Sequence, residues 1–380
     1  MISCGEPSGD LYAAELARRI RAHEPGATIT AFGGERLKAA GASLLGDFSG
    51  LSVTGLLEVA RLLPRTYAMY RRLVAAARRD RPDVLVAVDF PDFNFRLAAA
   101  IKRLGVPIVY YISPQLWAWR PGRMKTMRAL ADRVLVIFPF EEQIYRDAGV
   151  PVQWVGHPLL DVMPPPQPKD ALVARMGLPA AAPIVTLLPG SRPNEVRAIL
   201  PGLAAAAGRV RAGLPDVQFA VARAPHISDD LLAPLNSIRG ARPVVFDGHA
   251  DELLQVADVA LVASGTVTVQ AALHECPMVV VYRLSPLTYK LGRPFVRVST
   301  FAMANLVAGS RVVPELIQND FTPERVAAEA LDIVTNRARA ARMREDLRKV
   351  RLRLGTPGAS DRAAQAVLDV ARHGRATGLR

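Results

Sequence analysis

The stretch DVALVASGTVTVQAALHECPMVVV, residues 258–281, decides the fold of this chain. It opens with an apolar run ending at Ala263, breaks at residues 264–266, resumes with helical spacing and closes on a β-branched run. This order of patterns is typical of a strand, a tight turn, a helix and a second strand. Because neither apolar run alternates with polar residues, we expect parallel strands that are covered on both faces, as in an α/β sheet.

The turn at residues 264–266 is a candidate anion site, because ligands collect at the carboxyl edge of a parallel sheet. A helix that opens with Ser264, Gly265 and Thr266 presents backbone N–H groups, two hydroxyls and the positive end of its dipole. These groups suit a phosphate or a pyrophosphate. An ordinary turn with a capping Ser or Thr explains the same letters, and the sequence leaves both readings open.

A second turn of the same kind lies earlier in the chain. The strand expected at residues 184–188 is followed by PGSR at residues 189–192, and Pro193 suits the first turn of a helix. The arginine of this turn, Arg192, can bind two phosphate oxygens at once. Two such turns in one half of the chain reinforce the prediction of a phosphate site there.

Length and charge limit the function classes. A chain of 380 residues is long for one core, and we expect two α/β domains of roughly 160 to 190 residues each. The net charge of +13 calls for nucleic acid, an anionic membrane surface or a phosphorylated substrate, unless it reflects composition alone. The sequence has no zinc finger, RNA-recognition motif or basic helix-turn-helix, so we expect no nucleic-acid partner.

The cysteines, the histidines and the hydrophobic runs indicate whether disulfides, metal sites or membrane segments are expected. The two cysteines, Cys4 and Cys276, fall in expected buried elements, and the six histidines lack ligand spacing. We therefore expect neither a disulfide nor a metal site. No run approaches the ~20 apolar residues of a membrane span, and no signal-peptide pattern opens the chain, so a soluble cytoplasmic protein is expected.

The first half repeats a strand-helix pattern. The expected strands are residues 1–4, 28–32, 84–88, 107–112 and 132–137. The loop GEPSGD, residues 5–10, follows the first strand, and it lacks the third glycine of GxGxxG, so NAD and FAD are poorly supported. The aromatic segment SPQLWAW, residues 113–119, is expected to be a loop.

The proline-rich run at residues 164–169 is interpreted as a semi-rigid linker. It separates a first domain, residues 1–163, from a second domain, residues 170–354, and residues 355–380 form a C-terminal helix and tail. We expect residues 294–309 to be irregular and Ser360 to cap the last helix. Two such domains would form a cleft between their strand ends, where two substrates meet.

The segment DFPDFNF, residues 89–95, places carboxylates directly after an apolar strand. A carboxylate there can accept the proton of an attacking hydroxyl if it lies within ~3 Å of that oxygen. We favour Asp89 as this base, because Asp92 is explained as the cap of a helix that begins at Phe93. The alternative that both aspartates cap the helix stays open. In the second half, Ser191, Arg192 and Thr266 would neutralise a departing diphosphate without a divalent ion.

Residues 56–79, LLEVARLLPRTYAMYRRLVAAARR, mix apolar and basic side chains around Pro64. Such a segment can lie on an anionic lipid surface. The expected membrane contacts are Leu62, Leu63, Met69, Tyr70, Arg65, Arg71 and Arg72. A core-facing helix with a solvated basic face explains the pattern equally well.

Several motifs, in order along nearly the whole chain, carry a family resemblance. They are GEPSGD, DFPDFNF, SPQLWAWRPGR, GHP, LLPGSRPNEV, ALVASGTVTVQ with CPMVV after it, and ANLVAGSRVVPELIQ. The chain resembles lipid-A-disaccharide synthase. The resemblance implies a GT-B fold, with two Rossmann-like domains facing across a cleft and the C-terminal helix packing back on the first. It also implies an inverting transfer of 2,3-diacylglucosamine from its UDP conjugate to the 6-hydroxyl of 2,3-diacylglucosamine 1-phosphate, lipid X.

The resemblance also assigns roles to residues. It makes Asp89 the general base, and Arg192 and Asn305 important for activity. The substrate-binding positions that its motifs imply are Gly5, Glu6, Ser8, Gly9, Asp10, Asp92, Asn94, Trp117, Trp119, Gly190, Ser191, Glu195, Ser264, Gly265, Thr266 and Gln270. Family members are peripheral on the cytoplasmic face of the membrane, and their UDP-sugar is a substrate, so no cofactor is expected. A monomer and a homodimer are both compatible with the sequence.

Three positions depart from the family pattern. Gln270 stands where a glutamate is usual, and in GT-B enzymes that carboxylate commonly holds the ribose hydroxyls. Ala304 replaces a proline, and the first strand lacks its usual lead-in. Two alternatives are an enzyme like UDP-N-acetylglucosamine 2-epimerase and a non-catalytic relative that binds nucleotide or lipid phosphate.

Overall fold

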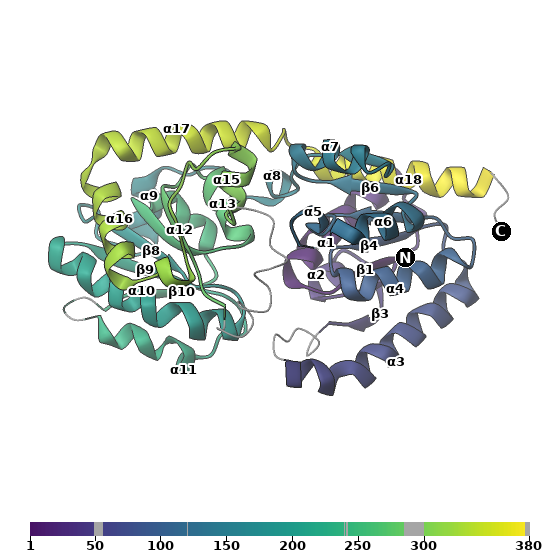
Figure 1. Cartoon of the computed structure of the whole chain (residues 1–380), viewed down its shortest axis with the longest axis horizontal. Helices are drawn as coiled ribbons and strands as arrows, with labels where there is room; N and C mark the ends of the chain where they lie inside the picture. The colour runs from purple at the N-terminus through teal and green to yellow at the C-terminus, as the bar shows by residue number, and fades with distance from the viewer. Residues whose placement is uncertain (49–55, 120, 239, 241, 285–299, 377–380) are drawn as a thin grey trace. The chain divides into compact units, whose positions relative to one another are not determined.

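The chain consists of two compact units in its computed structural model (Figure 1). Unit 1 comprises Met1–Val162 and Leu354–Arg380, and unit 2 comprises Met163–Arg353. The structure describes residues 1–48, 56–119, 121–238, 240, 242–284 and 300–376, with the backbone alone at residues 56–62, 119, 121, 375 and 376. The chain thus enters unit 2 beside the proline-rich run and returns to unit 1 before its last helix.

A seven-stranded parallel sheet forms the middle of unit 1, in the order β3-β2-β1-β4-β5-β6-β7. Its strands are β1 (Ile2–Cys4), β2 (Thr30–Gly33), β3 (Ser43–Asp47), β4 (Leu85–Val88), β5 (Ile108–Tyr111), β6 (Arg133–Val136) and β7 (Val152–Trp154). Its helices are α1 (Pro7–His23), α2 (Glu35–Ala39), α3 (Leu56–Asp80), α4 (Pro91–Lys102), α5 (Leu116–Trp119), α6 (Met124–Leu130), α7 (Pro139–Asp147), α8 (Leu159–Val162) and α18 (Ala359–Ala376). β1, β4 and β5 are buried along their whole length, because helices cover both faces.

Unit 2 holds a six-stranded sheet in the order β10-β9-β8-β11-β12-β13, also parallel throughout. Its strands are β8 (Ile184–Leu188), β9 (Gln218–Arg223), β10 (Val244–Asp247), β11 (Val259–Ala263), β12 (Met278–Tyr282) and β13 (Glu315–Ile317). Its helices are α9 (Lys169–Arg175), α10 (Pro193–Gly213), α11 (Asp229–Leu232), α12 (Ala250–Val256), α13 (Thr266–Leu273), α15 (Met303–Ala308), α16 (Pro323–Thr335) and α17 (Arg337–Arg353). The strand-turn-helix-strand pattern predicted for residues 258–281 is confirmed as β11, α13 and β12.

Each sheet reverses its strand order at one point. In unit 1, β1 lies beside β4 with Cys4 opposite Val88, and in unit 2, β8 lies beside β11 with Leu188 opposite Val262. Chain connections leave such a pair in opposite directions, and this switch point is where open α/β sheets bind ligands. The predicted turns GEPSGD and DFPDFNF follow β1 and β4, and PGSR and SGT follow β8 and β11. The two sheets therefore carry all four predicted turns at equivalent places.

Some helices extend into segments that were expected to be loops. α1 begins at Pro7, so the last four residues of GEPSGD form its first turn, where proline is well suited. α4 begins at Pro91, so the prediction that Asp92 caps a helix starting at Phe93 is wrong. SPQLWAW contains the short helix α5, and α15 occupies most of the described part of residues 294–309. Residues 294–299 lie outside the described part of the chain.

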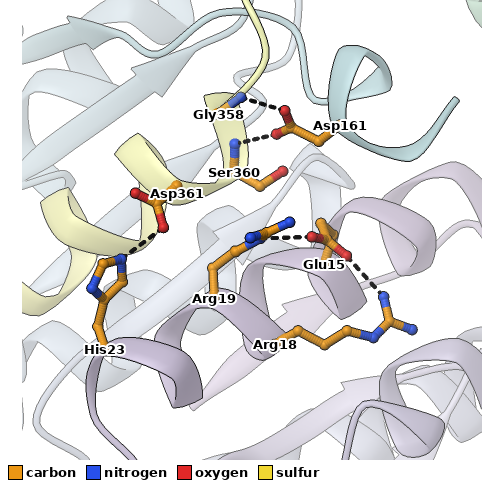
Figure 2. A network of polar contacts seen from close by, with 8 residues as sticks. All are labelled: Glu15, Arg18, Arg19, His23, Asp161, Gly358, Ser360 and Asp361. Carbon is orange, nitrogen blue, oxygen red and sulfur yellow. Dashed lines mark hydrogen bonds and ion pairs between the residues drawn. The ribbon is translucent and has the colours of Figure 1, made fainter. Parts of the chain in front are cut away.

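The C-terminal helix α18 belongs to unit 1, as the resemblance implied. It begins at Ala359, so the prediction that Ser360 is its cap is wrong. Asp161 of α8 caps it instead, accepting hydrogen bonds from the backbone N–H of Gly358 at 2.5 Å and of Ser360 at 2.7 Å (Figure 2). His23 of α1 lies 2.7 Å from the Asp361 carboxylate. These contacts attach the end of the chain to the helices of unit 1.

Helix α3 is continuous through Pro64 and shows two kinds of apolar side chain. Leu63 and Tyr67 are 56% and 62% exposed. Met69 and Tyr70 are partly buried and pack against the core cluster of unit 1. The two predicted membrane contacts at Met69 and Tyr70 thus face the core at least in part, because they follow the buried side of the helix.

The basic predicted contacts on α3, Arg65, Arg71 and Arg72, are exposed. The side chain of Leu62 lies outside the described part of the chain. None of the described helices is both long enough and apolar enough to cross a bilayer.

Candidate active site

The turn after β4 carries the predicted base. Asp89 is partly buried, and its φ of 45° is followed by a φ of 49° at Phe90. Two successive non-glycine residues in the left-handed region are uncommon and mark a constrained turn. Asp89 thus lies at the β1/β4 switch point on a backbone that other groups must hold.

Asn94 is one of these groups, and it is fully buried. Its Nδ2 donates to the carbonyl oxygens of Asp89 at 2.8 Å, Val88 at 3.2 Å and Ser3 at 3.3 Å, and its Oδ1 accepts from the Ser3 hydroxyl at 2.7 Å. The Asn94 amide is thus engaged within the fold, and its predicted contact with substrate stays a prediction.

Gly5 explains why GEPSGD and DFPDFNF occur together. A Cβ at residue 5 would lie 2.3 Å from ring atoms of Phe90, so only glycine lets this ring pack against the loop after β1. Phe90 in turn packs on Phe93, with ring centroids 5.6 Å apart. The glycine therefore supports the turn that carries Asp89.

Asp10 has a structural role. Its carboxylate accepts hydrogen bonds from the backbone N–H of Gly34 at 2.7 Å, Arg36 at 3.0 Å and Leu37 at 3.3 Å. These are the N–H groups at the start of α2, which a carboxylate satisfies well. In this structure the Asp10 side chain is buried and caps α2, and its predicted contact with substrate stays a prediction.

The other predicted positions of GEPSGD divide by burial. Gly9 is buried against Cys4, whereas Glu6 and Ser8 are partly exposed at the β1 edge. Asp92 is exposed and forms an ion pair with Arg123 at 2.6 Å, which connects α4 to the segment after SPQLWAW. Glu6 and Ser8 therefore share the switch-point edge with Asp89.

A buried glutamate that the sequence did not reveal supports the aromatic segment. Glu141 accepts a hydrogen bond from Trp117 Nε1 at 3.3 Å and one from the Phe138 N–H at 3.3 Å. Burial raises its pKa from 4.5 to about 8. Glu141 holds the Trp117 indole within unit 1, while the side chain of Trp119 lies outside the described residues.

The histidine of the GHP motif is a second buried titratable group. His157 is 1% exposed, and its ring centroid lies 6.1 Å from that of Tyr12 and 5.4 Å from that of Phe138. Burial lowers its pKa from 6.5 to about 3, so the imidazole is neutral. Its Nδ1 accepts from the Leu159 N–H at 3.2 Å, which is a capping contact for α8 rather than a catalytic one.

In unit 2, the PGSR turn is organised by Glu195. The glutamate accepts hydrogen bonds from the backbone N–H of Ser191 at 3.2 Å and of Arg192 at 3.3 Å, and from the Arg192 guanidinium at 3.1 Å. Gly190 has a φ of 122°, and a Cβ there would lie 2.8 Å from Glu195. A carboxylate thus already occupies the anion-favouring start of α10 and orients the arginine.

The SGT turn presents an open helix start. Gly265 is the N-cap of α13, and both Gly265 and Thr266 are exposed at the β11 edge. Inside the helix, the Thr268 hydroxyl donates to the Gly265 carbonyl at 2.9 Å. The Ser264 hydroxyl donates to the carbonyl of Phe301 at 3.3 Å, which ties this turn to the segment before α15.

Asn305 supports that segment from within the fold. Its Nδ2 donates to Val313 O at 2.9 Å and to Glu315 at 2.6 Å, and its Oδ1 accepts from the N–H groups of Val312 at 2.7 Å and Val313 at 2.9 Å. An asparagine amide has two donors and two lone pairs, so these bonds fill its capacity. Asn305 is 1% exposed and supports the backbone of residues 312–313, and its predicted importance for activity stays a prediction.

Glu315 is the partner that sequence reasoning missed. Besides Asn305, it accepts from the N–H of Phe301 at 2.8 Å and of Ala302 at 3.1 Å, at the start of α15. Through Phe301 it is connected to Ser264. The spacing of Asn305 and Glu315 along the chain does not predict this contact, because only the fold brings residues 301–315 beside the SGT turn.

Gln270 lies on α13, and its amide faces α12. Its Nε2 donates to Asp251 Oδ1 at 2.7 Å, and His274 Nε2 lies 2.7 Å from the same oxygen. Burial raises the pKa of Asp251, but the hydrogen bonds from His274 and Gln270 outweigh it and leave that pKa below its ordinary value. A carboxylate therefore stands beside Gln270, on the neighbouring helix.

The chain is similar to known proteins along nearly its whole length. A family model described as Lipid-A-disaccharide synthetase matches residues 1–370. A lipid-A-disaccharide synthase of Myxococcus xanthus is 44% identical over 375 residues, 99% of this chain and 98% of that protein. The chain belongs to the lipid-A-disaccharide synthase family. A synthase of Geobacter sulfurreducens is 41% identical, over 97% of this chain and 96% of its own length.

Solved structures support the fold of this chain. The S. aureus MnaA-UDP co-structure has a TM-score of 0.69 at 13% identity, covering 97% of this chain and 96% of that one. The glycotransferase of kitacinnamycin has a TM-score of 0.64 at 19% identity, covering 97% and 98%. The predicted GT-B fold is confirmed, and so are the predicted family and glycosyltransferase class. Membership of this family places the chain in lipid A biosynthesis and favours transfer over the epimerase alternative.

The structure brings many of the predicted site residues to two sheet edges. Glu6, Ser8 and Asp89 lie at the β1/β4 edge of unit 1. At the β8/β11 edge of unit 2 lie Gly190, Ser191, Arg192, Glu195, Ser264, Gly265 and Thr266. Among the described residues, no group of three or more His, Cys, Asp or Glu is placed to hold a metal ion.

Proposed function

We propose that this chain transfers 2,3-diacylglucosamine from its UDP conjugate to the 6-hydroxyl of lipid X, with inversion at the anomeric carbon. The observation that carries the proposal is the family match over residues 1–370, with the family's turn motifs at both sheet switch points. The acceptor oxygen forms the new bond to C1 as the bond from C1 to the diphosphate breaks. UDP leaves, and the acceptor proton goes to a base on unit 1.

Asp89 is the proposed base. It follows β4 directly, it is partly buried, and the hydrogen bonds to its backbone come from buried side chains. A carboxylate in such a fixed place can take the acceptor proton as the oxygen attacks. Glu6 and Ser8 share its sheet edge and are proposed to contact the acceptor sugar.

Unit 2 is proposed to hold the donor. The exposed start of α13 at Gly265 and Thr266 offers backbone N–H groups to the diphosphate, and Arg192 adds a guanidinium. These groups stabilise the charge that develops on the leaving UDP, so we propose that transfer needs no metal ion and no cofactor. Gln270, with the Asp251 carboxylate beside it, is proposed to bind the ribose.

The acceptor is a lipid, so we propose that the protein is peripheral on the cytoplasmic face of the inner membrane. On α3, the exposed Leu63 and Tyr67 lie among the exposed Arg65, Arg71 and Arg72. Apolar side chains enter the headgroup boundary and arginines pair with anionic lipid. This surface is proposed to attach the protein where its substrates reside.

The activity test uses the purified chain with UDP-2,3-diacylglucosamine and lipid X in detergent, with mass detection of the disaccharide and of UDP. We expect both products only when both substrates are present. Asp89→Asn should reduce turnover about 100-fold or more while calorimetry shows unchanged UDP binding. Asparagine suits this position because it tolerates a positive φ. Epimerised sugar without lipid X, or full turnover by Asp89→Asn, would contradict the proposal.

The membrane test is co-sedimentation with phosphatidylglycerol vesicles. The double variant Leu63→Ser, Tyr67→Ser should release the protein from the vesicles. Leu352→Ser in α17, which is 73% exposed on unit 2, is the matched control and should remain bound. Equal release of the control, or unchanged binding of the double variant, would exclude α3 as the attachment surface.

A further inference from the structure

The carboxyl edge of the unit 1 sheet concentrates unusual backbone geometry around Asp89. Asp89 and Phe90 after β4 have φ of 45° and 49°, and Ile112 after the adjacent β5 has a φ of 55°. Isoleucine is β-branched, so a positive φ there is a genuine outlier. Such conformations persist only when surrounding contacts determine them.

Two buried side chains converge on a single carbonyl of this turn. Tyr110 of β5 is 1% exposed, and its hydroxyl donates to Asp89 O at 2.8 Å. Asn94 of α4 donates to the same oxygen from Nδ2, also at 2.8 Å. A carbonyl oxygen has two lone pairs, so these two donors fill its capacity. The Asp89 N–H donates to Tyr111 O at 3.2 Å, which fixes the other side of the residue.

The consequence of this arrangement is a fixed orientation of residue 89. With its N–H and its C=O both held, neither φ nor ψ of Asp89 can change without breaking a hydrogen bond. The direction of the Cα–Cβ bond is thereby set, and with it the volume that the carboxylate can reach. Misplacing a catalytic group by about 1 Å can reduce turnover 100-fold, so such a clamp has catalytic value.

We propose that Tyr110 and Asn94 are positioning residues that aim the Asp89 carboxylate at the acceptor hydroxyl. The proposal rests on the function proposed above, in which Asp89 is the base. Tyr110 acts through the backbone and does not touch the substrate. Ser3 completes the clamp, since its hydroxyl donates to Asn94 Oδ1 at 2.7 Å and orients the amide.

The test is Tyr110→Phe, which removes one donor and keeps the ring in the core. We expect kcat to fall about 10- to 100-fold with the KM of both substrates unchanged, because the base is misplaced and not the substrates. The pH at which kcat/KM rises should stay where it is, since Tyr110 bonds the carbonyl and not the carboxylate. Tyr12→Phe is the control, because the buried Tyr12 hydroxyl has no hydrogen-bond partner among the described residues.

A double-mutant cycle separates positioning from general damage. If Tyr110 acts through Asp89, Tyr110→Phe should have no further effect on the residual rate of Asp89→Asn. An undiminished effect in that background, a shifted pH profile, or an unchanged kcat in Tyr110→Phe would overturn the proposal. Asn94→Ala removes the other donor to the same carbonyl. It should likewise lower kcat and leave the KM of both substrates unchanged.

The outcomes also distinguish this inference from the proposed function. If Asp89→Asn by itself keeps full turnover, Asp89 is not the base and the function proposal fails first. If Asp89→Asn loses turnover and Tyr110→Phe does not, only the clamp is wrong. Thermal unfolding of each variant, measured beside the rates, shows that folded protein is being compared.

Discussion

The turn after β4 in unit 1 and the turns after β8 and β11 in unit 2 occupy equivalent places in two parallel sheets, yet they are built differently. In unit 1, buried side chains hold the backbone of Asp89 in the left-handed region. In unit 2, Gly265 and Thr266 are exposed, and Arg192 is oriented by the side chain of Glu195.

The difference follows from the chemistry that each turn is proposed to perform. A base must place one carboxylate within hydrogen-bond reach of one oxygen, so its backbone is fixed by several contacts. A diphosphate carries many equivalent oxygens, and a helix start offers several N–H groups, so small displacements are tolerated. Changes in unit 1 should therefore alter stability and turnover together, whereas changes in unit 2 should alter turnover alone.

The largest expected effect tests the unit 2 side of this comparison. Arg192→Ala should lower kcat/KM for the donor about 100-fold or more, because a cation is lost where charge develops on UDP. The thermal midpoint should barely change, since the Arg192 side chain is 39% exposed and exposed ion pairs contribute little. Arg197→Ala on the exposed face of the same helix is the control. A large loss of stability in Arg192→Ala would break the comparison.

The next largest expected effect tests unit 1 by disturbing the packing of Gly5 against Phe90. Gly5→Ala should destabilise the protein by about 1–3 kcal/mol and lower turnover, because the new Cβ meets the Phe90 ring. The loss should be smaller in a Phe90→Ala background, where that ring is absent. Gly26→Ala, where a Cβ meets nothing within 4 Å, should leave both quantities unchanged. Denaturant unfolding and steady-state rates measure them, and normal stability of Gly5→Ala would count against the packing argument.

A smaller expected effect is the pH dependence of folding stability, which arises from buried groups of unit 1. Burial raises the pKa of Glu141 from 4.5 to about 8, so the fold binds a proton that the unfolded chain releases, and stability falls as pH rises through this window. Burial lowers the pKa of His157 from 6.5 to about 3, so the unfolded chain binds a proton that the fold does not. His157 therefore reduces stability as pH falls from about 6.5 towards 3.

Above about pH 6.5, Glu141 contributes a decline of the thermal midpoint, which the buried Met1 amino group opposes because burial lowers its pKa from 8.0 to about 6. Glu141→Gln stays neutral and keeps an acceptor for Trp117, so it should flatten that decline. Melting curves of the wild type and the variant between pH 5 and 8 provide the measurement. A decline of equal slope in the variant would assign the pH dependence to other groups.

The last prediction is that removal of divalent metal ions does not change turnover. Because the donor turns are proposed to neutralise the diphosphate with N–H groups and Arg192, excess EDTA should leave turnover unchanged. A DxD-type glycosyltransferase assayed beside it should lose its activity. Loss of activity here that magnesium restores would place the neutralising charge on a metal ion and remove the basis of the comparison.

Local patterns in the sequence were enough to predict the βα alternation, the two switch-point turns of unit 2 and the position of Asp89. Each rests on a short run of residues, because apolar strands, glycine turns and helix starts are local in character. The same local patterns did not reveal that Asp10, Asn94 and Asn305 have structural partners within the fold. A polar residue in a motif reads as a ligand contact, whether its partner is a substrate or a distant backbone group.

The sequence by itself determined the fold class and which residues form each turn. What only the tertiary structure decided is which polar groups remain available at the sheet edges. Glu315 reaches Phe301 and Asn305 across a loop, Tyr110 reaches Asp89 from the next strand, and Glu141 reaches Trp117 from another helix. These partners are separated by 10 to 24 residues of the chain, and a hydrogen bond depends on separation in space, which local sequence does not encode.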